Sequence, residues 1–353
     1  MLAASAIRQK AHELGFDLIG FAPVGQTPHA QAFTRWLEAD MHGEMAWLAR
    51  EPSKRADPRN VMPNTKTVVT VGVSYDTLAV PMDVLQDPAR GRIARYAWGA
   101  DYHDVITPKL RAFGEWMTRE NRAYVDTGPV MERAWAQACG LGFIGKNTCL
   151  IHRKRGSYLF LGAVLVGEEI EDEQEPVSRP PSPVLGCGNC ARCLAACPTG
   201  ALVAPHVLDA RLCISYLSIE LKGAIPINLR PRMGNWVFGC DACQDVCPYV
   251  RRFSAPSTHA EFYPLDVNRA APKLADALSW SPEEFARIFK GSPVKRAKWR
   301  GFMRNLCVAA GNSGDGTLAP TLSHLSQSED PLVSEHARWA LEHLMAKQQT
   351  SSA

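Results

Sequence analysis

The chain has 353 residues, which favours two or three domains, and its 46% hydrophobic and 21% charged residues are ordinary for a globular protein. The net charge of +3 is small, although its distribution along the chain is uneven. Charges throughout the first fifteen residues argue against a signal peptide, and the longest apolar run, over 158–167, is too short to span a bilayer. We therefore expect a cytoplasmic protein that does not associate with membranes.

Residues 1–175 predict an α/β domain. Apolar residues recur at helical spacing over 3–14, and that helix stops at Gly15. The clearest strand is the run TVVTVGVS over 67–74. The other expected elements are, in order, a strand over 18–22, a helix over 31–49, a helix from about 104 to 120, a strand over 123–125, a helix over 129–139 and an apolar strand over 158–166.

Asp126 lies at the end of the strand predicted over 123–125. In open α/β sheets the carboxyl ends of strands form the ligand crevice. A partly desolvated carboxyl group in such a crevice can donate a proton. The spacing leaves one alternative open, in which Asp126 caps the helix over 129–139, although Thr127 is better placed for that role.

An acidic and proline-rich segment follows this domain. Six of the eight residues over 168–175 are acidic, and prolines stand at 176, 180, 181 and 183. This composition is typical of a solvated linker between domains. We expect a ferredoxin-like domain over 176–257 and a helical domain over 258–353.

Eight cysteines between residues 187 and 247 form two blocks. The first block has the spacing C-x2-C-x2-C-x3-C-P, in which the fourth cysteine of bacterial ferredoxins ligates the other of two [4Fe–4S] clusters. The second block, C-x2-C-x3-C-P, lacks one cysteine, which Cys213 can supply. Crossing the fourth ligands gives two sets of four, namely Cys187, Cys190, Cys193 and Cys247, and Cys197, Cys213, Cys240 and Cys243.

Zinc and disulfide bonds are the alternatives for these cysteines. Zinc sites use paired CxxC blocks, usually with a gap between them, and disulfides need an oxidising compartment that nothing in the sequence indicates. The spacing favours iron–sulfur clusters over both, and two clusters in one chain imply electron transfer. The three remaining cysteines are expected to be buried thiols: Cys139, Cys149 and Cys307.

The last 96 residues predict helices. Two of them, over 294–311 and 330–344, are similar to HEAT-type repeat helices about 37 residues apart. Between residues 286 and 304 there are seven basic residues and no acidic ones, with Trp299 and Phe302 interleaved. This density of one sign indicates contacts with RNA phosphates, although an ordinary exposed basic face is the alternative. The residues expected to bind RNA are Lys290, Lys295, Arg296, Lys298, Arg300 and Arg304.

Three other motif matches are rejected, because the order of the surrounding elements or a required residue differs from the motif. The GxGxxG match over 140–145 follows a predicted helix and leads toward a strand, which reverses the dinucleotide-binding order. The P-loop match over 140–146 has Asn147 where a Ser or Thr should hold magnesium. The Asp-x-His over 101–103 begins a motif for a cobalamin axial ligand, but Ile106 replaces its glycine. His103 is then either an ordinary hydrogen-bonded residue or part of a pocket.

The order and spacing of several segments together resemble the epoxyqueuosine reductase family over almost the whole chain. The segments are RYAWGADYHD (95–104), VDTGPVMER (125–133), GLGFIGKNT (140–148), the cysteine blocks with CISYL (213–217), and GSPVKR (291–296). The resemblance implies an N-terminal cobalamin-binding domain, with the corrin between it and the ferredoxin-like domain. It also implies that the HEAT-like helices hold a tRNA anticodon stem-loop that carries epoxyqueuosine.

The resemblance further implies the roles of individual residues. Asp126 matches the proton donor of the family, and Tyr102 and His103 face the substrate side. The residues at the cofactor-binding site would be Arg55, Tyr102, His103, Arg133, Asn147, Leu150 and Ser215. We expect a monomer that receives electrons from an external donor.

The implied reaction replaces an epoxide by an alkene with loss of water, which takes two electrons and two protons. The clusters and cobalamin would supply the redox chemistry, and the protein would supply orientation and a proton. One alternative is a reductive dehalogenase-like enzyme that uses the same cofactors on a small organohalide, against which the basic helices and the missing twin-arginine start argue. Another is a ferredoxin-like electron carrier, which leaves the residues ahead of the clusters unexplained.

Overall fold

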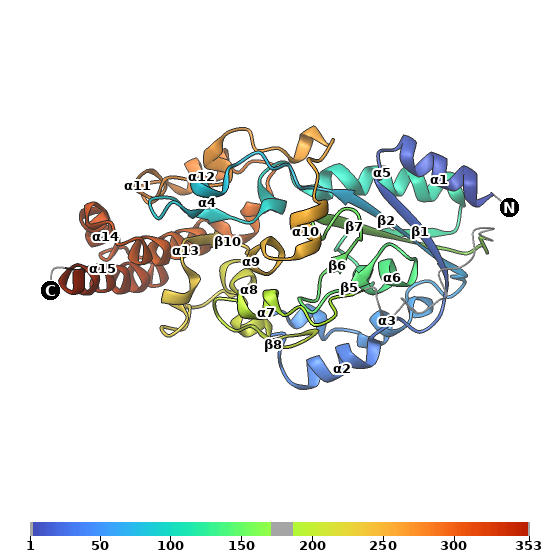
Figure 1. Cartoon of the computed structure of the whole chain (residues 1–353), viewed down its shortest axis with the longest axis horizontal. Helices are drawn as coiled ribbons and strands as arrows, with labels where there is room; N and C mark the ends of the chain where they lie inside the picture. Colours follow the sequence, from blue (N-terminus) through green and yellow to red (C-terminus); the bar gives the residue numbers. More distant parts are fainter. Residues whose placement is uncertain (1–2, 171–185, 352–353) are drawn as a thin grey trace.

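The computed structural model describes residues 3–170 and 186–351. The chain is elongated, with an N-terminal sheet near one end, the last helices at the other end, and the cysteine-bearing segments between them (Figure 1). Most of the predicted acidic and proline-rich linker, residues 171–185, lies outside the described residues. None of the helices in the described ranges combines the length and the apolar character that crossing a bilayer requires.

A four-stranded sheet in the order β1-β2-β7-β4 organises the N-terminal part. Its central strand β2 is buried along its whole length, because helices cover both faces of the sheet (Figure 1). Val69 and Val71 pack toward α1 and α5, while Val68 packs toward α6, as the two-residue period of a strand requires. The bounds are α1 Ala4–Glu13, β1 Leu18–Pro23, β2 Thr67–Ser74, α5 Tyr102–Met117, β4 Asn121–Tyr124, α6 Glu132–Ala138 and β7 Leu159–Val166.

The strand directions of the sheet do not suit the crevice argument made for Asp126, which needs parallel strands. Every neighbouring pair of strands is antiparallel. The crevice at the carboxyl ends of parallel strands therefore does not exist here, and the argument that placed Asp126 in such a crevice was wrong. Asp126 is positioned by a loop instead.

The helix predicted over 31–49 is also shorter than expected, because α2 (Ala30–Glu38) ends eleven residues early. Asp40 and Gly43 have φ angles of 52° and 58°, which an α-helix cannot accommodate. A Cβ at Gly43 would lie 2.5 Å from the Tyr216 hydroxyl oxygen, so only glycine allows this turn to pack against the cysteine-bearing segment.

Short elements build that cysteine-bearing segment. The helices α7 and α9, one from each cysteine block, contact each other, and β10 pairs with β3 from the N-terminal part. The pairing joins segments that are far apart in the chain. The bounds are β3 Arg92–Ile93, β5 Phe143–Ile144, β6 Leu150–Ile151, α7 Arg192–Ala195, β8 Leu202–Ala204, β9 Val207–Leu208, α8 Ile214–Ile219, β10 Trp236–Phe238, α9 Ala242–Asp245 and α10 Pro248–Phe253.

Helix α13 forms the centre of the C-terminal part and packs along α15 (Figure 1). The two helices approach closely at Gly311, where a Cβ would lie 2.8 Å from Cα of Ala340. An unbroken run over 302–311 in α13 is buried. The remaining helices are α3 Pro52–Ala56, α4 Met82–Gln86, α11 Leu274–Ala277, α12 Pro282–Ile288, α13 Lys298–Ser313, α14 Ala319–Leu325 and α15 Pro331–Ser351.

Candidate active site

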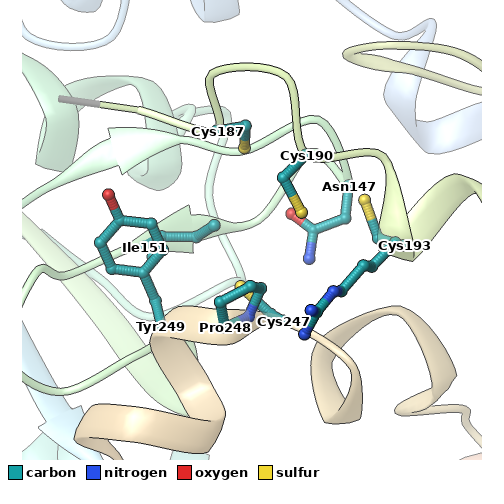
Figure 2. A pocket seen from close by; sticks show the side chains of 9 residues that line it. Asn147, Ile151, Cys187, Cys190, Cys193, Cys247, Pro248 and Tyr249 are labelled. Atoms are coloured by element: carbon teal, nitrogen blue, oxygen red, sulfur yellow. The ribbon is translucent and has the colours of Figure 1, made fainter. Parts of the chain in front are cut away.

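The first predicted set of cysteines surrounds one pocket (Figure 2). Three of its members come from the first cysteine block and the fourth, Cys247, comes from the second, as the crossed pattern predicts. Their sulfur atoms point toward a common space. The pocket is lined by Asn147, Ile151, Cys187, Cys190, Arg192, Cys193, Cys247, Pro248 and Tyr249.

The loop over 140–149 in the N-terminal part, here called the glycine-rich loop, contacts this pocket through Lys146. Its backbone N–H donates to Sγ of Cys187 at 3.4 Å. Its Nζ donates to the carbonyl oxygens of Gly188 at 2.7 Å and Cys190 at 3.0 Å. The loop that failed as a nucleotide-binding motif therefore holds the first cysteine block.

The second predicted set is also brought together. Cys213 interacts electrostatically with Cys197, and Cys240 does so with Cys213. Cys243 interacts in the same way with both Cys240 and Cys213. Cys213 therefore lies near the other members of the predicted set.

Cys149 lies against this second set, because its thiol hydrogen-bonds to Cys243. The sequence indicated only a buried thiol at Cys149, and no spacing rule links a single cysteine in the glycine-rich loop to a cysteine about a hundred residues later. Cys139 and Cys307 are buried in apolar cores, as expected.

The arrangement suits iron–sulfur clusters better than single metal ions. Within residues 3–170 and 186–351, no three His, Cys, Asp or Glu side chains lie close enough together to hold one metal ion. A tetrahedral zinc ion with Zn–S bonds of about 2.3 Å would bring its sulfurs within about 4 Å of one another. A cube-shaped cluster holds its thiolates farther apart, and the pocket in Figure 2 lies between four cysteines, as such a group requires.

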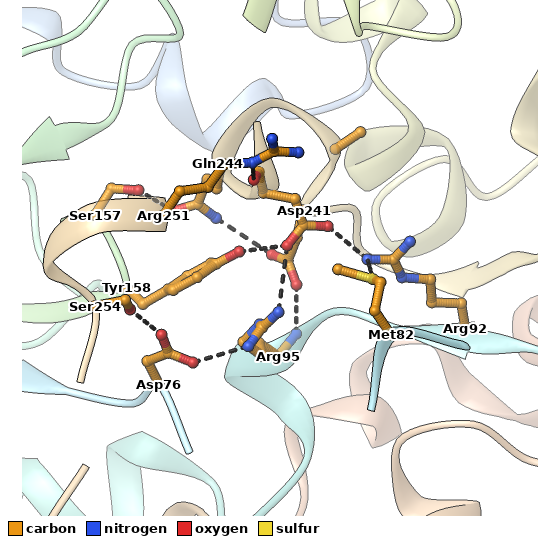
Figure 3. Close-up of polar contacts among 12 residues, drawn as sticks. Asp76, Met82, Arg92, Arg95, Ser157, Tyr158, Asp241, Gln244, Arg251 and Ser254 are labelled. Atoms are coloured by element: carbon orange, nitrogen blue, oxygen red, sulfur yellow. Dashed lines mark hydrogen bonds and ion pairs between the residues drawn. The ribbon is translucent and has the colours of Figure 1, made fainter. Parts of the chain in front are cut away.

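A buried network of charges attaches the second cysteine block to the N-terminal part (Figure 3). Arg95 donates Nη1 to Asp76 at 2.8 Å and Nη2 to Asp245 at 3.3 Å. Its backbone N–H donates to Asp241 at 2.7 Å, and the Tyr158 hydroxyl donates to Asp245 at 2.6 Å. The side chains of Arg95 and Asp76 are only 7% and 2% exposed. Because Asp241 and Asp245 stand between the cysteines of their block, the network fixes the position of those thiols.

Asp126 lies in the loop between β4 and α6, with its side chain exposed and a φ of 56°. Tyr102 at the start of α5 donates its hydroxyl to Oδ2 of Asp126 at 2.8 Å. The backbone N–H of Asp126 donates to Oε1 of Glu132 at 3.0 Å. Helix α6 begins at Glu132 with Met131 at its N-cap, so the alternative that Asp126 or Thr127 caps this helix was wrong.

Glu132 is a site residue that the sequence did not reveal. Burial, together with the nearby charge of Asp126, raises the pKa of Glu132 to about 8. The carboxyl group is therefore mainly protonated at pH 7. Burial and the neighbouring Asp126 also raise the pKa of Tyr102 well above its ordinary value, so that Tyr102 remains a hydrogen-bond donor.

Tyr102 is part of an aromatic stack that fixes its ring. The ring lies 4.5 Å from that of Phe160 and 4.0 Å from that of His103. His103 contacts Asp101 through Nδ1 at 2.8 Å, and this hydrogen bond raises the pKa of His103. Tyr102 thus reaches Asp126 directly, whereas His103 is a hydrogen-bonded residue at the beginning of a helix.

Arg55 lies beside both Asp126 and Glu132. It donates Nη1 to the carbonyl oxygen of Gly128 at 3.4 Å. Its Nε is buried and has no hydrogen-bond partner among the described residues. A buried donor without an acceptor is costly, so Arg55 fits a ligand that brings acceptors, as the amide groups and phosphate of cobalamin do.

The other residues predicted to contact cobalamin occupy different surroundings. Arg133 donates Nη1 to the carbonyl oxygen of Thr148 at 2.9 Å and so ties α6 to the glycine-rich loop. Ser215 is half-buried in the first turn of α8, two residues after Cys213. The Leu150 side chain is buried in an apolar core with Trp135, which leaves only its backbone for a cofactor. Asn147 lies among the first set of cysteines.

Arg304 corrects the prediction of an RNA-binding row. Its side chain is 1% exposed and donates to the carbonyl oxygens of Leu217, Leu221 and Gly223. Burial lowers the pKa of Arg304 to about 10. This arginine stabilises the end of α8 and is not available to RNA.

The remaining basic residues are exposed. Arg296 pairs with Glu220 through hydrogen bonds of 2.6 and 3.0 Å, and Arg300 pairs with Asp330 at 2.7 Å. Both arginine side chains remain more than half exposed. All the charged residues between 286 and 304 are basic, but acidic residues from other elements partly neutralise their charge.

Two family models match this chain. Residues 186–250 match a 4Fe-4S double cluster binding domain, and residues 55–127 match epoxyqueuosine reductase QueG, DUF1730. The chain is 43% identical to the epoxyqueuosine reductase of Pseudomonas aeruginosa over 349 residues, which cover 96% of this chain and 93% of the relative. The chain belongs to the epoxyqueuosine reductase family. The epoxyqueuosine reductase of Escherichia coli is 38% identical over 96% of this chain and 88% of its own.

Solved structures of epoxyqueuosine reductases share this fold. One of them, in complex with an epoxyqueuosine-modified tRNA-Tyr stem loop, has a TM-score of 0.84 and 30% identity over 96% of this chain and 89% of its own. Another, from Bacillus subtilis, has a TM-score of 0.82 and 29% identity over 96% and 90%, and its catalytic aspartate loop is swung out of the active site. These matches confirm the predicted family, the enzyme class and the iron–sulfur part of the chain.

Proposed function

We propose that this chain reduces epoxyqueuosine to queuosine in the anticodon loop of tRNA. The observation that supports the proposal is the exposed carboxyl group of Asp126, whose Oδ2 accepts a hydrogen bond from the Tyr102 hydroxyl at 2.8 Å. The same chain belongs to the family and brings two sets of four cysteines together. An accessible carboxyl group held in one orientation suits the donation of a proton to a departing oxygen.

The eight cysteines would hold two [4Fe–4S] clusters, and Arg55, Arg133 and Ser215 would contact cobalamin. When bound, these groups supply electrons one at a time and a low-valent cobalt that stores them near the substrate. The unpaired Nε of Arg55 supports a ligand at this place, because nothing else in the described part of the chain satisfies it. An external reductant would recharge the clusters.

The chain's own residues orient the substrate and supply a proton. In its protonated form, Asp126 gives a proton to the epoxide oxygen as the C–O bond breaks. Tyr102 fixes Oδ2 of Asp126, which leaves Oδ1 for the substrate. Two electrons and two protons convert the epoxide into an alkene and water.

The three proposed parts of the chain divide this work. Residues 1–175 would form the cobalamin-binding domain, residues 176–257 the two-cluster domain and residues 258–353 the HEAT-like domain that binds tRNA. The exposed side chains of Lys290, Lys295, Arg296, Lys298 and Arg300 would contact phosphates of the stem-loop.

The test compares Asp126→Asn with the wild-type chain and with the control Asp104→Asn, which makes the same change at another exposed aspartate. Each protein is loaded anaerobically and given a stem-loop that carries epoxyqueuosine, and queuosine is measured by mass spectrometry. We expect Asp126→Asn to retain about eight irons and to lose turnover, while the control matches the wild type. Normal turnover by Asp126→Asn would remove the proton-donor role.

A further inference from the structure

Asn147 occupies an unusual place in the pocket that the first cysteine set surrounds (Figure 2). Its residue is only 4% exposed, yet it carries a polar carboxamide. Buried amides normally satisfy their donors and acceptors within the protein. The environment of its two polar atoms therefore indicates what else the pocket holds.

Only the oxygen of this carboxamide has a hydrogen-bond partner among the described residues. Oδ1 accepts the backbone N–H of Cys149 at 3.3 Å, and this contact fixes the orientation of the group because only the oxygen can accept. Nδ2 is buried and has no hydrogen-bond partner among the described residues. Figure 2 shows this nitrogen directed toward the space between the cysteines.

The glycine-rich loop is built to hold Asn147 in this position. A Cβ at Gly145 would lie 2.7 Å from Oδ1 of Asn147 and 2.5 Å from Cδ1 of Ile151, so a side chain there would displace the carboxamide. Thr148 has a φ of 65°, and its carbonyl oxygen is held by Arg133 at 2.9 Å. The turn thus presents Asn147 to the cysteines, beside the Lys146 N–H that already donates to Cys187.

We propose that Asn147 donates a hydrogen bond from Nδ2 to a sulfur of the [4Fe–4S] cluster held by Cys187, Cys190, Cys193 and Cys247, and thereby raises the reduction potential of that cluster. Leaving a buried donor unsatisfied is costly, and cluster sulfurs are acceptors. A donor stabilises the reduced cluster more than the oxidised one, because reduction adds negative charge. The inference rests on the cluster of the proposed function and assigns Asn147 to it as a positioning and tuning residue.

The competing explanation is that Asn147 only shapes the turn. Its Oδ1 contact with Cys149 is the kind of local bond that Asn makes in turns. That role uses the oxygen and leaves the nitrogen without a function. A test must therefore remove the donor and retain the acceptor.

The variants are Asn147→Asp, which keeps the acceptor oxygen and removes the N–H donor, and Asn147→Leu, which removes both without adding charge. Asn228→Asp makes the same chemical change at an exposed asparagine and is the control. Both cluster potentials are measured by anaerobic redox titration with EPR detection. The second cluster of the same molecule serves as an internal reference.

We expect both Asn147 variants to shift one cluster to a more negative potential. A roughly tenfold less favourable reduction corresponds to about 59 mV for a one-electron couple. The other cluster and the Asn228→Asp control should stay unchanged. Unchanged potentials in both variants, or a shift in Asn147→Asp alone, would overturn the proposal, since the latter reports only the added charge.

A second measurement leaves Asn147 itself unchanged. In Asn189→Ser protein, which lacks the other asparagine beside these cysteines in sequence, ¹⁵N is placed in the side-chain amides of asparagine. Pulsed EPR of the reduced cluster should show a ¹⁵N coupling from Asn147, and its absence refutes the hydrogen bond. Turnover of epoxyqueuosine RNA in the same samples separates the two proposals, because full turnover without the coupling overturns only the role of Asn147.

Discussion

Replacing Glu132 by Gln should stabilise the protein in a way that depends on pH. Gln keeps the size of the side chain and an Oε1 oxygen that can accept the N–H of Asp126. It removes the ionisation of a carboxyl group that lies beside Asp126 and that burial keeps protonated. This buried carboxyl group lowers the free energy of unfolding of the wild-type chain, and Glu132→Gln removes that loss.

The size of the effect follows from the raised pKa. Glu132 ionises near pH 4.5 in the unfolded chain and near pH 8 in the folded chain. Each pH unit between these values reduces the free energy of unfolding of the wild-type chain by about 1.4 kcal/mol, because the folded state binds the proton more tightly. The loss begins near pH 4.5, reaches about 3 kcal/mol at pH 7 and levels off above pH 8.

Urea denaturation under anaerobic conditions at several pH values measures this difference. The advantage of Glu132→Gln over the wild type should grow by about 2 kcal/mol between pH 6 and pH 7.5. The control Glu38→Gln changes an exposed glutamate and should stay within about 0.5 kcal/mol of the wild type at every pH. An advantage of Glu132→Gln that does not change with pH would refute the reasoning.

Three further predictions concern buried charge and RNA binding. Burial lowers the pKa of His336 to about 4, so the contribution of His336 to the free energy of unfolding should fall by about 3 kcal/mol between pH 6.5 and pH 4, measured as the difference between the wild type and His336→Gln; a difference that does not change with pH contradicts the assignment. Arg95→Met should cost about 3–5 kcal/mol in urea denaturation, whereas Arg59→Met, at an exposed ion pair, should cost much less; equal effects would count against the buried network. Changing Lys295 and Lys298 to Gln should reduce the salt dependence of stem-loop binding by roughly 0.7–0.9 in log–log slope per lysine, and an unchanged slope excludes their phosphate contacts.

Local sequence patterns predicted the parts of the molecule that depend on local physics. The run TVVTVGVS identified β2, and the helical spacing of apolar residues identified α1. The cysteine spacing predicted two crossed sets of four because each C-x-x-C fits one short turn around a cluster. Strand direction was not predictable in the same way, because antiparallel pairing depends on connections between segments that are far apart in the chain.

The candidate site shows the same limit for single residues. Arg304 looked like part of a basic surface, but its acceptors are carbonyl oxygens from Leu217, Leu221 and Gly223, some eighty residues earlier. Glu132 stands six residues after Asp126, yet only the folded loop buries it and brings the two carboxyl groups together. Neither burial nor these partners can be read from the composition of the surrounding segment.

The packing of Asn147 depended on tertiary structure as well. The resemblance placed it with the cobalamin contacts, whereas the folded chain places it among cysteines that follow it by 40 to 100 residues. The glycine-rich loop gave a clue in its Gly145, because a residue without a side chain leaves room for a neighbour. It did not indicate which group the neighbour faces.

The most direct test is the conversion of a stem-loop that carries epoxyqueuosine by the anaerobically loaded wild-type chain, supplied with a chemical reductant and analysed by mass spectrometry. We predict one queuosine for each pair of electrons consumed, in protein that holds about eight irons and one cobalt per chain. Loss of the product in Asp126→Asn, with the metals retained, should accompany that result. Fully loaded wild-type protein that binds the stem-loop and leaves epoxyqueuosine unchanged would contradict the proposed function.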